Sequence, residues 1–163
     1  MKVTESEYRE VEQFIYKEAR LADMSLYTEW EALLNDDFEY MVPIEHGESD
    51  PTKRLLILYD NRARAATRVR MLKTGVRHTQ TPPSVMSRVI SNIEVERVQD
   101  GEFKVYATFV LGEMQLQALP AKHIWSGRYE YHLKSVDGEL GMSLKKVFLI
   151  DSAHKIPALG FLI

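Results

Sequence analysis

The chain has no cysteine among its 163 residues. This absence excludes disulfides, zinc sites with cysteine ligands, iron–sulfur clusters held by cysteine and thiol nucleophiles. It also fits a reducing cytoplasm. The first residues are charged and contain no apolar signal core, and no apolar run approaches the roughly 20 residues that span a bilayer. We therefore expect a cytoplasmic protein that does not use a membrane.

The chain also carries little excess charge, with a formal net charge of −3. This balance gives no electrostatic reason to expect nucleic-acid binding. Glycine-rich phosphate loops are absent, and no basic sheet with interleaved aromatics is visible. The basic residues between Arg62 and Arg77, which include Arg68, are scattered around a helix and form no single stripe. They suggest a solvated face or a docking surface.

Three helices are predicted in the first half of the chain. Thr4 and Glu7 fit a capping box, and apolar residues at helical spacing predict a helix over residues 5–22. Ser25 can cap a second helix that keeps Trp30 and Leu34 on its buried side. Asp60 can cap a third helix that Gly75 closes. Short strands are expected at residues 38–42 and, less distinctly, 55–59.

The second half predicts four long strands, beginning with residues 82–98, where Val89, Ser91, Ile93 and Val95 would share one face. Further strands are expected over residues 103–114, 123–134 and 142–151, and Asp137-Gly138 is a hairpin signal. Helices followed by strands are typical of the α+β class. We expect one domain over residues 1–163: a cone-shaped, curved antiparallel sheet with N-terminal helices packed on it and an internal cavity.

The residues themselves offer two kinds of chemical site. The five histidines, which include His46, His78 and His123, show no metal-ligand spacing, so no metal site is predicted. Asp36 and Asp37 could act as a general base at a cavity mouth, with Tyr40 as donor. The same carboxylates also suit a plain helix-ending turn, which needs no chemistry.

Five ordered segments resemble one family. FIYKEARLAD (14–23) is similar to the family's first helix, with its E-A-x-x-x-D pattern. TEWEALLNDDFEYMVP (28–43) is close to a family segment of ordered Trp, Leu, Asp, Tyr and Pro. YDNRARAATRVRMLKTG (59–75), PPSVMSRVISNIEV (82–95) and GRYEYHLK (127–134) follow in the family's order. Together they resemble the small, or beta, subunit of Rieske-type aromatic-ring-hydroxylating dioxygenases.

The resemblance implies the cone fold of ketosteroid isomerase and scytalone dehydratase. It also implies a structural and assembly role beside a catalytic alpha subunit, which carries a Rieske [2Fe-2S] cluster and non-haem iron. Three small and three large subunits usually associate, and a reductase or ferredoxin supplies electrons from NAD(P)H. A Rieske centre needs two cysteines, so this chain cannot hold one. No catalytic residue, cofactor site or metal site is expected in it.

The sequence departs from the family pattern at one place. The resemblance also does not identify the interface residues. Lys145 and Lys146 stand where arginine is common in the family, and lysine cannot make arginine's bidentate ion pair. The docking role and the expected exposure pattern suggest interface residues, namely Arg62, Arg68, Arg88, Asn92, Trp125, Arg128 and Tyr129.

Two alternatives remain. The chain could be a stand-alone cone-fold isomerase or dehydratase using Asp36, Asp37 or His123 as base and Tyr40 as donor. It could also bind a small ligand in the same cavity without turnover.

Overall fold

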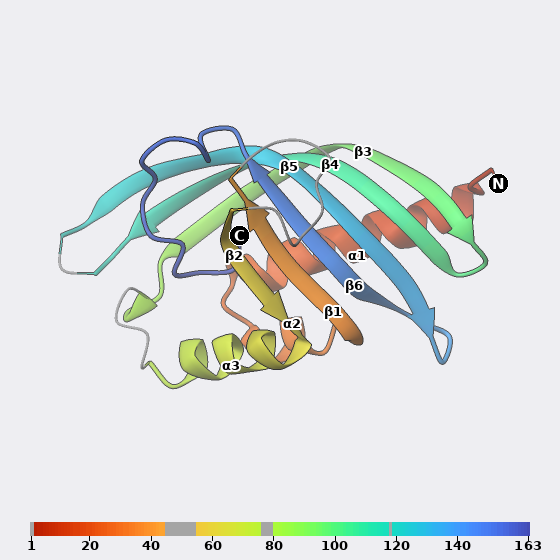
Figure 1. Ribbon diagram of the computed structural model, residues 1–163, viewed down its shortest axis with the longest axis horizontal. Coiled ribbons are helices and arrows are strands. Elements are labelled where there is room, and N and C mark those ends of the chain that lie inside the picture. The colour runs from red at the N-terminus through yellow and green to blue at the C-terminus, as the bar shows by residue number, and fades with distance from the viewer. Residues whose placement is uncertain (1, 45–54, 76–79, 118) are drawn as a thin grey trace.

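The computed structural model describes residues 2–44, 55–75, 80–117 and 119–163. Within these ranges, three helices and six strands follow one another along the chain. They are α1 (Glu5–Asp23), α2 (Tyr27–Glu31), β1 (Leu34–Pro43), β2 (Leu56–Asn61), α3 (Arg62–Lys73), β3 (Val85–Gln99), β4 (Glu102–Gln115), β5 (Ala121–Val136) and β6 (Glu139–Leu149). The long strands curve over α1, and α2 and α3 lie near β1 and β2 (Figure 1). The α+β class and the curved sheet are confirmed.

The six strands form one sheet in the order β2-β1-β6-β5-β4-β3. Neighbouring strands are antiparallel except β1 and β6, which pair in parallel. The sheet is therefore mixed, and the expectation of a wholly antiparallel sheet is wrong at this pairing. The β1–β2 pair joins the later four-stranded meander along β6, which sequence order alone does not predict.

Helix α1 begins as the sequence predicts. The Thr4 side chain accepts a hydrogen bond from the Glu7 backbone, and the Glu7 side chain returns one to the Thr4 backbone. The apolar stripe of α1 is buried against the concave face of the sheet, with Val11, Ile15 and Ala22 fully shielded from solvent. This packing provides most of what holds the helix in place.

The second helix is shorter than predicted, and strand β1 is longer. Ser25 does not cap α2; its φ is 56°, and the N-cap position is Leu26, without a side-chain cap. The backbone N–H of Met142 donates to the Leu33 carbonyl at 2.8 Å, which starts the pairing of β1 with β6. Leu34 is therefore a strand residue, because tertiary pairing overrides its local helical spacing.

Helix α3 is capped one residue later than predicted. Asn61, not Asp60, is the N-cap, and its side chain accepts a hydrogen bond from the Arg64 N–H at 3.0 Å. Asp60 instead pairs through its side chain with Arg68. Gly75, with a φ of 68°, follows the helix as predicted.

Strand β3 contains a β-bulge that exchanges its two faces. The register with β4 shifts between Ser91 and Glu94, and Asn92 has a φ of 53°. Before the bulge Ile90 points inward and Val89 is 67% exposed, whereas after it Ile93 packs against the core. The prediction that Val89 and Ile93 share one face is therefore wrong, because the extra residue inverts the alternation.

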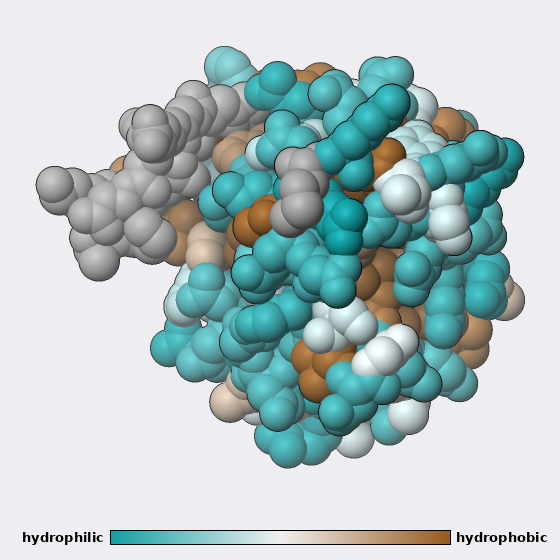
Figure 2. Space-filling view, turned by 90° about the vertical axis from the view of Figure 1, so that its right-hand side faces the viewer, coloured by the Kyte–Doolittle hydropathy of each residue, from teal (hydrophilic) through white to brown (hydrophobic). Residues whose placement is uncertain are grey.

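The hairpins at one end of the sheet are polar. Asp137 and Gly138 both have positive φ, 54° and 83°, which confirms the hairpin predicted there. Seen from this end of the molecule, the surface is mainly hydrophilic, with small apolar patches (Figure 2). The core lies on the concave side, between the sheet and α1.

Candidate functional site

The interior of the cone contains an ion pair. Lys145 Nζ, from β6, lies 2.7 Å from Glu18 Oε1, from α1, and both side chains are completely shielded from solvent. Trp30 Nε1 donates to the same carboxylate at 2.8 Å, and the Tyr131 hydroxyl donates to its second oxygen at 3.4 Å. The ammonium also lies 4.8 Å from the centre of the Tyr129 ring. Helix and sheet are thus joined by a closed polar cluster.

Electrostatics keep this pair charged near neutral pH. Burial raises the pKa of Glu18, but Lys145 and Arg88 outweigh it and leave that pKa below its usual value. Burial lowers the pKa of Lys145 to about 8, against the opposing attraction of Glu18. Both groups are therefore ionised at pH 7, and each needs the other, because an isolated buried charge is costly.

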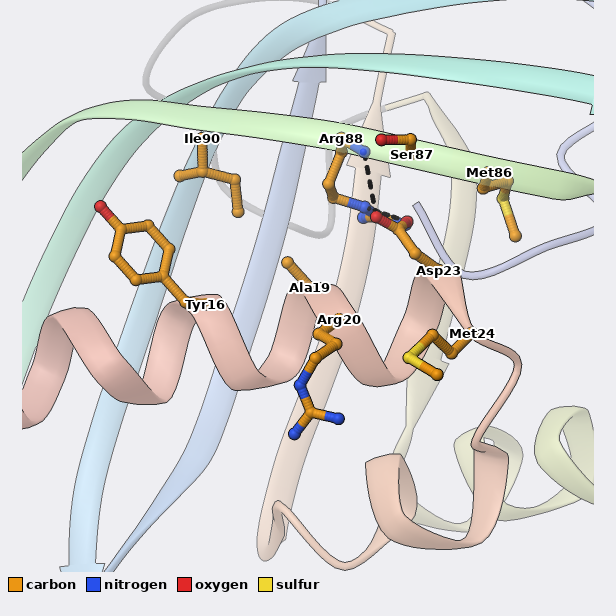
Figure 3. A pocket seen from close by; sticks show the side chains of 9 residues that line it. All are labelled: Tyr16, Ala19, Arg20, Asp23, Met24, Met86, Ser87, Arg88 and Ile90. Atoms are coloured by element: carbon orange, nitrogen blue, oxygen red, sulfur yellow. Dashed lines mark hydrogen bonds and ion pairs between the residues drawn. The ribbon is translucent and has the colours of Figure 1, made fainter.

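Arg88 forms a second buried cluster beside the first. Its side chain has no solvent exposure, and its Nε donates to Asp23 Oδ1 at 2.7 Å. Its two terminal nitrogens donate to the Tyr129 hydroxyl and to the Leu162 carbonyl, each at 2.9 Å. Figure 3 shows Arg88 reaching from β3 to Asp23 at the end of α1. One guanidinium therefore links helix, sheet and the last residues of the chain.

Those last residues, 161–163, fill the inside of the cone. Phe161, Leu162 and Ile163 are at most 1% exposed. The Tyr40 hydroxyl donates to the Ile163 carbonyl at 2.9 Å and accepts from the Ile163 N–H at 3.0 Å. The Phe161 ring packs edge-on against Trp125, with 5.5 Å between ring centres. The side chains of this segment therefore belong to the hydrophobic core.

Aromatic side chains complete the filling. Phe109 stacks on Tyr129 with ring centres 4.1 Å apart, and Trp125 Nε1 donates to the buried Glu113 carboxylate at 2.8 Å. Burial is the largest cause of the raised pKa values of Tyr40 and Tyr129. These phenols therefore stay neutral and act as hydrogen-bond partners rather than as bases.

The pockets described here lie at the surface. One, of about 330 Å³, lies between α1 and β3 and is lined by residues that include Tyr16, Arg20 and Met86 (Figure 3). Another, of about 370 Å³, includes Glu31 and Arg70 in its lining, from α2 and α3. Neither lining includes a residue of the predicted acid–base set.

That set is not assembled by the fold. Asp36 and Asp37 are exposed, and Asp37 accepts from the Ser143 hydroxyl at 2.7 Å. Tyr40 is fully buried, with its hydroxyl occupied by Ile163, and His123 is half-buried on β5. The two carboxylates therefore face solvent while the phenol faces the core, and their joint acid–base role stays a prediction.

The predicted interface residues divide by exposure. Trp125 and Tyr129 are 3% and 1% exposed, and the Arg88 side chain is buried, so their expected exposure is wrong. All three point to the concave side. There Arg88 donates to the Tyr129 hydroxyl, and Trp125 donates to the Glu113 carboxylate. Asn92 and Arg128 are exposed.

The two arginines of that set that lie on α3 form ion pairs within the chain. Arg62 pairs with Glu31 at 3.1 Å, and Arg68 pairs with Asp60 at 2.5 Å. The two cations are 30% and 13% exposed at the side chain. Their interface role stays a prediction.

The described ranges show neither a metal-binding cluster nor a membrane-spanning helix. No group of three or more His, Asp or Glu side chains there could hold a metal ion, and His46 and His78 lie outside those ranges. None of the helices described is both long and apolar enough to cross a bilayer.

The sequence held signals for the buried clusters that the predictions missed. Glu18 lies on the buried stripe of α1, between Ile15 and Ala22. Lys145 alternates with Val147 and Leu149 on the inward face of β6. A charged residue at a core position indicates a partner on the facing element.

A curved six-stranded sheet with helices on its concave side defines the class of the protein: an α+β cone fold. The structure of a scytalone dehydratase-like protein of Novosphingobium aromaticivorans covers 88% of this chain and 84% of its own, with a TM-score of 0.67 and 18% identity. The beta subunit of the benzoate 1,2-dioxygenase of Burkholderia mallei covers 99% of both chains, with a TM-score of 0.74 and 18% identity. These likenesses establish the cone fold.

Sequence similarity is more specific. Residues 17–155 match the model of the family described as "Ring hydroxylating beta subunit". The small oxygenase component of the p-cumate 2,3-dioxygenase system of Pseudomonas putida is 30% identical over 142 residues, covering 86% of this chain and 77% of that protein. The chain belongs to the family of ring-hydroxylating dioxygenase beta subunits.

Proposed function

We propose that this chain is the assembly subunit of the terminal oxygenase of an aromatic-ring-hydroxylating dioxygenase and has no catalytic residue of its own. The observation that carries the proposal is the filled interior. Residues 161–163, Trp125 and Phe109 occupy the space that a cone-fold enzyme would need for its substrate. A member of a dioxygenase family in which these described residues pack the inside of the cone is suited to supporting a catalytic partner.

The partner follows from the family and the composition. The proposed partner is a catalytic alpha subunit that holds the Rieske cluster and the non-haem iron. This chain lacks the two cysteines that a Rieske centre requires. The proposal includes a complex of three small and three large subunits, fed from NAD(P)H by a reductase or ferredoxin. It also places the chain, as one domain over residues 1–163, in the cytoplasm, where NAD(P)H is available.

Four residues of the predicted interface remain in the proposal because solvent reaches them. Asn92 and Arg128 lie on the convex face of the sheet, while Arg62 and Arg68 lie on α3. The ion pairs of Arg62 and Arg68 within the chain leave less of their charge for a partner. Of the two surfaces, the convex face is therefore the better candidate for the subunit interface.

The test is to tag this chain in its native source, purify it, and record native mass, iron content and the visible spectrum. We expect a large brown complex in which a second, cysteine-containing chain carries the iron–sulfur absorbance. An aromatic acid such as p-cumate, the substrate named for a relative, serves as a first probe of turnover by the complex. A colourless oligomer of this chain alone, with isomerase or dehydratase activity, would reject the proposal.

A further inference from the structure

The pocket of about 330 Å³ between the last turns of α1 and the first half of β3 has two well-defined walls. On the helix side, Tyr16, Arg20 and Met24 follow one another at intervals of four residues, so they form one row along the helix surface. On the strand side, Met86 and Ile90 lie across from this row (Figure 3). The volume falls within the range of small-molecule sites.

The walls suit an aromatic ring. The Tyr16 side chain extends from α1 toward Ile90 (Figure 3) and is 41% exposed. Two thioether side chains add to the lining: Met24, which is 60% exposed, and Met86, which is 8% exposed. Thioethers are polarisable and make favourable contacts with aromatic rings, and a tyrosine ring packs well on another ring. The apolar part of a ligand at this place is therefore best an aromatic ring.

The charges of the lining favour an anion. Arg20 is exposed and forms no ion pair with any residue that the structure describes. Asp23, the acidic residue of the lining, is already balanced by Arg88: its Oδ1 accepts from the Arg88 Nε at 2.7 Å and its Oδ2 from the Arg88 backbone N–H at 3.0 Å. The charge of Arg20 is left over, and it can pair with an anionic group of a ligand.

The edge of β3 adds backbone hydrogen-bonding groups. β3 is the last strand of the described sheet, so one of its edges has no neighbouring strand there. The N–H of Arg88 donates to Asp23 and therefore points away from β4, and the backbone groups of Ile90, two residues further on, point the same way. The Asp23 carboxylate already accepts a hydrogen bond from this edge. A ligand carboxylate can accept one from the Ile90 N–H in the same manner.

We propose that this pocket binds a small aromatic carboxylate. The ring lies between the row on α1 and the Met86 side chain, and the carboxylate meets Arg20 and the Ile90 N–H. Binding there involves no chemical step. A ligand that binds only the folded chain also raises its melting temperature. The inference goes beyond the proposed function and does not rest on it.

The test titrates the full chain with naphthoate and, separately, with naphthylmethanol, in which a neutral alcohol replaces the carboxylate. Calorimetry gives the two dissociation constants, thermal unfolding gives the shift in melting temperature, and hydrogen exchange locates the site. We expect naphthoate to bind more tightly than the alcohol and to raise the melting temperature. It should slow exchange at residues 86–90 more than exchange in β5.

One pair of variants tests the charge. Arg20→Gln should weaken naphthoate binding roughly three- to fivefold, the modest effect of an exposed ion pair, and leave binding of the alcohol unchanged. Arg9→Gln is the charge-matched control. Arg9 lies on the same helix, outside the pocket lining, and its side chain is 69% exposed, so this variant should bind both compounds like the unaltered chain.

A second pair tests the apolar wall. Tyr16→Ala/Met24→Ala should weaken binding of both compounds roughly tenfold, because the ring loses its contacts on α1. The control is Val98→Ala/Val136→Ala, which truncates two apolar side chains that are 47% and 49% exposed near the hairpins. It should bind both compounds normally. Urea unfolding of each variant shows that the fold is retained, since all the altered side chains reach solvent.

Several outcomes would overturn the inference. One is the absence of both binding heat and altered exchange at millimolar naphthoate. Another is unchanged binding by Tyr16→Ala/Met24→Ala, which would place the compound elsewhere. If naphthoate and the alcohol bind alike and Arg20→Gln changes neither, the carboxylate is not recognised and the proposed ligand class is wrong. Co-purification of the large subunit tests the proposed function separately, so either proposal can fail without the other.

Discussion

Glu18 and Lys145 form an ion pair of 2.7 Å across the interior of the cone, although 127 positions separate them in the chain. The Lys145 ammonium reaches one oxygen of the Glu18 carboxylate. It makes one short contact, and Trp30 donates to the same oxygen. Lysine makes a single-point contact here, and the donors Trp30 and Tyr131 complete the hydrogen bonding of the carboxylate.

Removing one partner of this pair should be severe. Glu18→Gln leaves the Lys145 ammonium buried without a counter-charge, and we expect a loss of about 3–5 kcal/mol in the free energy of unfolding. The double variant Glu18→Gln/Lys145→Met should recover part of it, because no buried charge remains. Urea unfolding measures both. Glu12→Gln, on the partly exposed face of α1, is the control and should change stability by less than about 0.5 kcal/mol. A double variant as unstable as the sum of the single changes would contradict the coupling.

The same pair should give stability an unusual alkaline dependence. Burial lowers the pKa of Lys145 from 10.5 to about 8 in the folded protein. Between pH 8 and 10.5 the unfolded chain therefore binds more protons at this site, so its contribution to stability rises with pH. The slope is at most about 1.4 kcal/mol per pH unit.

The measurement is urea unfolding from pH 7 to 10, with Glu18→Gln/Lys145→Met as the reference chain. The stability of the unaltered protein should rise relative to that reference above pH 8. The buried tyrosines, whose pKa values are raised in the folded protein, begin to lower stability as pH approaches 10, and they are common to both chains. A constant or falling difference would show that Lys145 does not titrate in this window.

Tyr40 should control how firmly residues 161–163 are held. Tyr40→Phe removes the hydroxyl that serves both the N–H and the carbonyl of Ile163. These buried groups then lack a partner, at a cost of about 1–3 kcal/mol. Hydrogen exchange at residues 160–163 should accelerate more than exchange in β5. Tyr16→Phe, whose hydroxyl bonds to Glu12 near the surface, should leave that exchange unchanged. Equal protection in both variants would mean that apolar packing alone holds the segment.

Two glycines on adjacent strands offer a matched comparison. A Cβ at Gly127 would lie 2.1 Å from the backbone oxygen of Phe148, whereas a Cβ at Gly112 would meet the Ser87 oxygen at 3.8 Å. Gly127→Ala must shift β5 against β6, so we expect a loss of about 3 kcal/mol. Gly112→Ala should be tolerated. Thermal and urea unfolding of both variants test this, and similar stability for the two would show that β5 yields at little cost.

Local sequence patterns determined much of this protein. The capping box at Thr4, the hairpin at Asp137-Gly138 and the long alternating strands each follow from interactions within a few residues. The lack of cysteine excluded a Rieske centre in this chain. The ordered motifs led to the family that the comparisons confirm.

The tertiary structure decided the rest. Leu34 joined a strand because β6 offered it a parallel partner, and the bulge at Asn92 inverted the faces of β3. Trp125, Tyr129 and Arg88 point inward because their partners on other segments lie on that side of the sheet. Burial depends on contacts between segments far apart in the chain, and alternation along a strand shows only that two faces differ, not which one the core covers.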